Sequence, residues 1–129
     1  MVAKNRILVV GGGAWGTAFA SRLAASGEEF SVFLWARDGK LVSTILKERE
    51  NSRYLPGMTI DSRLRISSDL SSLLVTWREA NEITQCRHIL ALAVPSTGFM
   101  SVCSLLKKLE LPNGVKVVSL CKGVVEHEG

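Results

Sequence analysis

The chain has 129 residues, of which 47% are hydrophobic, and it carries 16 basic and 12 acidic residues for a formal net charge of +4. That length and composition are typical of one folded domain and exclude a disordered chain. The only basic doublet is Lys107-Lys108, so the dense cationic stripe of a nucleic-acid-binding protein is missing and an anionic small ligand is expected instead. The apolar runs are too short for a signal peptide or a membrane span, which predicts a cytoplasmic protein with no membrane span and leaves an organelle address open.

Strand-like and helix-like patterns alternate along the chain. Short apolar and β-branched runs predict strands at 7–10, 30–35, 64–66, 88–94 and 115–120. Apolar residues at helical spacing predict helices at 14–26, 41–46, 69–74 and 99–109, with Asp38 and Asp69 as candidate N-caps. Pro56-Gly57 predicts that residues 50–58 form a loop.

This alternation predicts an α/β fold. Strands that alternate with helices are joined by right-handed crossovers, which produce a mostly parallel sheet covered on both faces. We therefore expect a doubly wound sheet of the Rossmann type, in one domain over residues 1–129. The chain stops soon after its fifth predicted strand, so we expect it to be one part of a larger protein.

A glycine-rich turn follows the first predicted strand. Gly11, Gly13 and Gly16 fit the pattern G-x-G-x-x-G, with a strand before it and a helix after it. In that context Gly11 permits the tight turn, Gly13 lets a diphosphate approach the backbone, and Gly16 lets the helix lie close to the strand. The positive end of the helix then faces the anion. The alternative is a glycine-rich turn that binds nothing.

The end of the second predicted strand bears on the choice of cofactor. In a dinucleotide site an acid at this position accepts hydrogen bonds from the ribose 2′-hydroxyl, whereas an arginine pairs with a 2′-phosphate. Arg37 therefore favours NADP over NAD, and Asp38 leaves the choice open. The alternative is that Arg37 is a solvated side chain and that Asp38 only caps the next helix.

Lys122 directly follows the last predicted strand and precedes Gly123. Ligands of open α/β sheets bind along the carboxyl edge of the strands, so the Lys122 ammonium is placed to stabilise negative charge on a carbonyl oxygen or to neutralise a phosphate. The alternative is an ordinary surface lysine on a loop.

Five segments occur in a characteristic order and spacing: GGGAWGTAFASRLA, FLWARD, ENSRYLPGM, LALAVPS and VSLCKGV. In these segments the chain resembles the NAD(P)-dependent glycerol-3-phosphate dehydrogenases over nearly its whole length. The tryptophan in the glycine turn, the N-x-x-Y-L-P-G loop and the Lys-Gly pair after the last strand are more specific than the glycines alone. The resemblance implies a Rossmann domain followed by a helical substrate domain that this chain lacks, in an enzyme that interconverts dihydroxyacetone phosphate and sn-glycerol 3-phosphate.

The resemblance also implies roles for individual residues. It implies cofactor contacts in the glycine turn, at the ends of two strands and at one lysine, namely at Gly11, Gly13, Ala14, Trp15, Gly16, Arg37, Val94, Pro95, Ser96 and Lys122. Lys122 is further implied to touch the substrate and so to be catalytic. The general acid and the arginine that binds the substrate phosphate are implied to lie in the helical domain. We expect NAD or NADP as cofactor and a homodimer for the full-length enzyme.

Two other functions stay open on the sequence. One is another two-domain NAD(P)-dependent reductase of the 6-phosphogluconate dehydrogenase or ketopantoate reductase type. The other is a non-catalytic NAD(H)-sensing Rossmann module. No metal site is predicted, because Cys86, His88, Cys121 and His127 lack the short spacings of structural zinc ligands.

Overall fold

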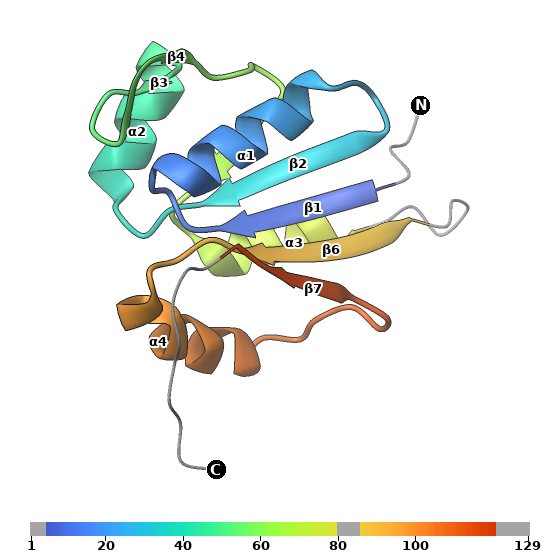
Figure 1. Cartoon of the computed structure of the whole chain (residues 1–129). Helices are drawn as coiled ribbons and strands as arrows, with labels where there is room; N and C mark the ends of the chain where they lie inside the picture. Colours follow the sequence, from blue (N-terminus) through green and yellow to red (C-terminus); the bar gives the residue numbers. More distant parts are fainter. Residues whose placement is uncertain (1–4, 80–85, 121–129) are drawn as a thin grey trace.

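The computed structural model describes residues 5–79 and 86–120, and its centre is a five-stranded parallel sheet (Figure 1). The strands lie in the order β5-β2-β1-β6-β7. Their bounds are β1 Asn5–Val10, β2 Phe30–Trp35, β5 Arg65–Ser67, β6 Arg87–Leu92 and β7 Lys116–Ser119. Each pair of neighbours is parallel. The predicted doubly wound sheet of the Rossmann type is confirmed.

Four helices cover the two faces of this sheet. Figure 1 shows α1 and α2 on one side and α3 and α4 on the other. Their bounds are α1 Ala14–Ala25, α2 Gly39–Glu48, α3 Leu70–Arg78 and α4 Ser96–Lys107. No helix in the described ranges is both long enough and apolar enough to cross a membrane.

Alternate residues of the central strands supply two separate cores. Ile7 and Val9 of β1 pack with buried residues of α1 and α2, whereas Leu8 and Val10 pack with buried residues of α3 and α4. Successive side chains of a strand point to opposite faces, so a continuous apolar run can serve both cores at once. This is why the strongest strands of the sequence have no polar face.

The starts of the helices are of two kinds. Asp38 caps α2, its Oδ1 accepting hydrogen bonds from the backbone N–H groups of Lys40 at 2.9 Å and Leu41 at 3.4 Å. Asp69 caps α3 as predicted, its Oδ1 accepting from the single backbone N–H of Ser72 at 3.2 Å. At α1 and α4 the N-cap positions hold Gly13 and Pro95, and no side chain caps either helix. Two helix N-termini thus keep backbone N–H groups that no side-chain cap satisfies.

The segment predicted as a loop contains a small antiparallel hairpin, so that prediction was wrong. β3 (Glu50–Asn51) pairs with β4 (Leu55–Thr59). Arg49, with a φ of 53°, adopts the left-handed conformation and ends α2, which lets the chain turn directly into β3. Pro56 is tolerated because a two-stranded ladder leaves one edge of each strand free of pairing.

Trp77 links α3 to the amino ends of β1 and β6. Its side chain is fully buried, and its Nε1 donates to the carbonyl oxygen of Arg6 at 2.8 Å. His88 lies edge-on to its ring, with centroids 5.3 Å apart, and its Nε2 lies 3.1 Å from the Trp77 carbonyl oxygen. Because a carbonyl only accepts, Nε2 carries the proton. Burial lowers the pKa of His88, and the Arg6 charge adds to this effect.

We expect this histidine to make the fold sensitive to mild acid. A lowered pKa means that the unfolded chain binds the proton more readily than the folded one, so the free energy of unfolding falls as the pH drops below the usual histidine value of 6.5. Chemical denaturation at pH 7.5 and pH 5.5 should show this loss, and His88→Gln should reduce it. An equal loss in the variant and the wild type would contradict the assignment to His88.

Candidate functional site

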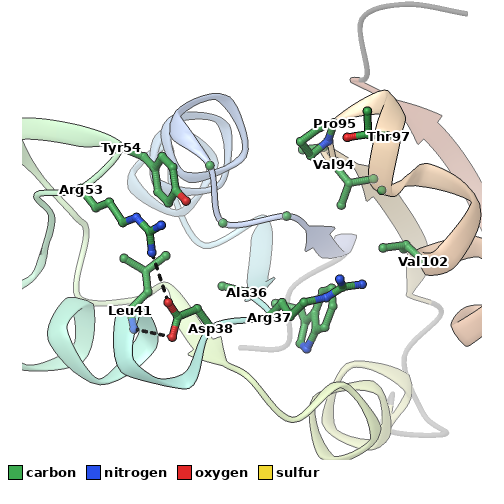
Figure 2. A pocket seen from close by; sticks show the side chains of 16 residues that line it. Ala36, Arg37, Asp38, Leu41, Arg53, Tyr54, Val94, Pro95, Thr97 and Val102 are labelled. Atoms are coloured by element: carbon green, nitrogen blue, oxygen red, sulfur yellow. Dashed lines mark hydrogen bonds and ion pairs between the residues drawn. The ribbon is translucent and has the colours of Figure 1, made fainter.

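A pocket of about 470 Å³ opens at the carboxyl ends of β1, β2 and β6 (Figure 2). It is lined by the turns that follow these three strands and by parts of α2, α4 and the β3–β4 hairpin, specifically by Gly11, Gly12, Gly13, Trp35, Ala36, Arg37, Asp38, Leu41, Arg53, Tyr54, Ala93, Val94, Pro95, Thr97, Gly98 and Val102. The helix after β1 lies on one face of the sheet and the helix after β6 on the other. This divergence of neighbouring crossovers creates the crevice in which open α/β sheets bind their ligands.

Three glycines of the turn are required by the fold itself. Gly11 has a φ of +131°, and a side chain there would overlap the Ala93 carbonyl oxygen. A Cβ on Gly12 would lie 2.5 Å from that of Ala36, and a Cβ on Gly16 would overlap the carbonyl oxygen of Gly11. The turn is therefore pressed against the ends of β2 and β6, with no space for side chains at these positions.

Gly13 is different. A Cβ built on this residue meets no atom within 4 Å, and its φ of −73° is open to any L-residue. Gly13 also lines the pocket. The pocket keeps a hollow at the N-terminus of α1 that one methyl group would begin to fill, and no contact among the described residues requires a glycine here. A ligand that closely approaches the backbone does explain it, so the turn fits the diphosphate of a dinucleotide.

The two uncapped helices both present their N-termini to this pocket. Gly13 precedes α1 and lines the pocket, as do Pro95, Thr97 and Gly98 at the start of α4. Neither helix has an acidic residue in its first turn. Unsatisfied N–H groups and the positive ends of two helix dipoles favour an anion here.

The side of the pocket formed by the start of α2 and the β3–β4 hairpin carries charged side chains. Asp38 pairs with Arg53 at 3.3 Å, and the Arg53 guanidinium lies 5.0 Å from the centroid of the Tyr54 ring. Arg37 extends toward α4, where its Nη2 donates to the Ser101 Oγ at 3.4 Å. Figure 2 shows Asp38, Arg53 and Tyr54 on one side of the glycine turn. The Asp38 carboxylate caps α2 and pairs with Arg53, so one guanidinium group and one engaged carboxylate lie on this side of the pocket, whereas the Arg37 guanidinium lies toward α4.

Eight of the residues singled out from the sequence fall into three groups. Those that line the pocket are Gly11, Gly13, Arg37, Val94 and Pro95. Gly16 is buried beneath the turn, whereas Ala14 and Trp15 lie exposed in the first turn of α1. Trp15 is 60% exposed and borders a separate hollow on the outer side of α1, away from the pocket.

Two of the singled-out positions carry less structural information. Ser96 is the first residue of α4. Lys122 lies outside the described residues. Within the described ranges, no three His, Cys, Asp or Glu side chains lie close enough together to hold a metal ion.

Sequence reasoning assigned no site role to Arg53, Thr97, Gly98 or the fully buried Asn51. Arg53 and Asn51 belong to the N-x-x-Y-L-P-G segment, so the signal was present in the sequence. The place of Asn51 and Arg53 at the site depends on the hairpin, which brings this segment to the glycine turn.

Strand order, glycine turn and crevice together define a Rossmann-type nucleotide-binding fold. A family model described as NAD-dependent glycerol-3-phosphate dehydrogenase N-terminus matches residues 6–129, and the chain belongs to this family.

Individual relatives agree with this family. The chain is 36% identical to glycerol-3-phosphate dehydrogenase (NAD(P)+) of Carboxydothermus hydrogenoformans over 121 residues, which are 94% of this chain and 32% of that protein. A Plasmodium falciparum glycerol-3-phosphate dehydrogenase structure superposes with a TM-score of 0.79 at 25% identity, covering 98% of this chain and 34% of that one. The Coxiella burnetii enzyme superposes with a TM-score of 0.75 at 27% identity, covering 94% and 33%. The chain thus spans about a third of the length of the relatives it matches.

The two kinds of glycine lead to opposite expectations. Gly16→Ala should lower the free energy of unfolding by about 1–3 kcal/mol, because the turn must move away from the helix to admit the methyl group. Gly13→Ala should change it by less than about 1 kcal/mol, because the residue has an ordinary φ and open space. It should nevertheless weaken dinucleotide binding by about tenfold or more.

Chemical denaturation and calorimetric titration of both variants check these expectations. If Gly13→Ala bound a dinucleotide as tightly as the wild type, the hollow would have no part in binding.

Proposed function

We propose that this chain is the dinucleotide-binding domain of a glycerol-3-phosphate dehydrogenase, extending over residues 1–129. The hollow at Gly13, between two uncapped helix N-termini, is the observation that carries the proposal. In this reading the main-chain N–H groups at the start of α1 bind the diphosphate. Val94 and Pro95, at the end of β6, border the part of the crevice that takes the nicotinamide.

The reaction is a hydride transfer between NAD(P)H and dihydroxyacetone phosphate, or its reverse from sn-glycerol 3-phosphate. Family membership and the relatives' names support this reaction. The nicotinamide supplies the hydride when the cofactor is bound, and the protein supplies position and electrostatics. The remaining two-thirds of the relatives' length is the expected place for the substrate-binding part. Resemblance to the family is the support for a homodimeric, cytoplasmic enzyme.

NADP is the proposed cofactor. Arg37 and Arg53 both line the pocket, Arg53 paired with Asp38 and Arg37 extended toward Ser101 of α4, and they would supply positive charge to a phosphate added to the adenosine ribose. Guanidinium groups form strong charge-assisted hydrogen bonds with phosphate oxygens. The Asp38 carboxylate is held by the start of α2 and by Arg53, which leaves it poorly placed to select an unphosphorylated ribose.

Parallel calorimetric titrations of the chain with NADPH and NADH test the proposal. We expect tighter binding of NADPH, and Arg37→Gln should weaken NADPH about tenfold with little effect on NADH, as expected for one lost hydrogen bond to a charged group. Arg22→Gln is the matched control, because it removes the same charge from the outer side of α1. Failure of the chain to bind either dinucleotide would contradict the proposed function, and equal binding of both would contradict the NADP preference.

Lys122 is proposed to touch both cofactor and substrate. Its ammonium would stabilise the negative charge that develops on the substrate oxygen as hydride arrives at carbon. In an enzyme that carries this chain together with its substrate-binding part, Lys122→Ala should lower kcat/KM for dihydroxyacetone phosphate by about 100-fold or more. Steady-state kinetics measure this, and near-normal turnover and substrate affinity would rule out the role.

A further inference from the structure

Asn51 is a polar residue with no exposed surface, and both its Nδ2 and its Oδ1 are hydrogen-bonded. From its place in β3, its Nδ2 donates to the Gly12 carbonyl oxygen at 3.0 Å and to the Thr17 Oγ1 at 3.0 Å. Its Oδ1 accepts from the backbone N–H of Tyr54 at 3.2 Å. The Gly12 carbonyl oxygen only accepts and the Tyr54 N–H only donates, so the orientation of the amide is determined by its partners.

This amide restrains the peptide unit between Gly12 and Gly13. A peptide flanked by two glycines rotates at little steric cost, so it needs an external restraint. The Gly12 carbonyl oxygen has two donors, Asn51 Nδ2 and the Thr17 hydroxyl at 3.3 Å. In a trans peptide the carbonyl and the following N–H point in opposite directions. Holding the Gly12 carbonyl against Asn51 therefore turns the Gly13 N–H away from Asn51.

The same side chain connects the two walls of the pocket. Its Nδ2 holds the glycine turn, and its Oδ1 holds the backbone of Tyr54, next to Arg53. Gly12, Gly13, Arg53 and Tyr54 all line the pocket. Along the chain, α1, β2 and α2 separate the glycine turn from the β3–β4 hairpin. The hydrogen bonds of the Asn51 side chain therefore join two segments that are distant in sequence.

We propose that Asn51 is a positioning residue for dinucleotide binding. It keeps the Gly13 N–H aimed at the diphosphate before the ligand arrives, so that binding does not have to reorient the peptide. This inference rests on the proposed function, because it assumes that the ligand carries a diphosphate at Gly13.

The primary test is Asn51→Asp in this chain, with calorimetric titration of NADPH and of adenosine 2′-monophosphate, which has no diphosphate. The carboxylate that this substitution introduces keeps the acceptor for the Tyr54 N–H but repels the Gly12 carbonyl oxygen. At pH 8.5 we expect NADPH affinity to fall about tenfold or more relative to the wild type, and adenosine 2′-monophosphate affinity to change less than about threefold. Burial beside the Gly12 carbonyl raises the pKa of this carboxyl group, so its protonated fraction, which can donate to Gly12, grows from pH 8.5 to pH 6 and the NADPH deficit should shrink.

A second pair of variants serves if Asn51→Asp does not fold. Thr17→Val preserves the shape of a buried residue but removes the hydroxyl that bonds both Gly12 and Asn51. It should weaken NADPH about three- to fivefold, whereas Thr17→Ser keeps the hydroxyl and should bind as the wild type does. Thermal unfolding of each variant shows whether the fold is retained.

The outcomes separate the inference from the proposed function. Wild-type NADPH affinity in folded Asn51→Asp at pH 8.5, or in folded Thr17→Val, overturns the inference alone. Equal weakening of NADPH and adenosine 2′-monophosphate also overturns it, because a general loosening of the pocket would affect both ligands. A wild-type chain that binds no dinucleotide overturns the proposed function as well.

Discussion

The close approach of the β1–α1 turn to the ends of β2 and β6 is the constraint on which the site depends. At Gly11, Gly12 and Gly16 there is no room for a Cβ, because the carbonyl of Ala93, the side chain of Ala36 and the backbone of the turn already occupy the space. Any side chain at these positions would move α1 away from the sheet. With the helix held in place, its N-terminus opens onto the crevice instead of onto bulk solvent.

The helix N-termini at the pocket differ in how they are capped. α2 begins at the pocket with a capping carboxylate, since Asp38 both caps this helix and lines the pocket, and α3 is capped by Asp69. α1 and α4, which also begin at the pocket, have neither a capping side chain nor an acid in the first turn. An acid there would satisfy the N–H groups but would repel a phosphate. The same contrast holds among the glycines, since Gly13 alone of the turn has open space around it.

The pocket is asymmetric, and this asymmetry matches a two-ended ligand. One side carries the Arg53 guanidinium and the Tyr54 ring, which suits the adenosine of a dinucleotide. The other is formed by the largely apolar turn after β6, which suits a flat ring such as the nicotinamide. In the proposed binding mode the diphosphate lies between them, at the N-terminus of α1. The buried amide of Asn51 joins the glycine turn to the backbone of Tyr54, although these belong to distant segments.

The sequence by itself determined the alternation of strands and helices, the parallel sheet, the caps at Asp38 and Asp69 and the position of the glycine turn. Each of these depends on contacts within a few residues or on a repeating apolar pattern, and local sequence encodes both. The hairpin at Glu50–Thr59 and the roles of Asn51 and Arg53 were decided only by the tertiary structure. Asn51 bonds Gly12 across 39 residues and Thr17 across 34, and no local pattern records which distant carbonyl a buried amide will meet.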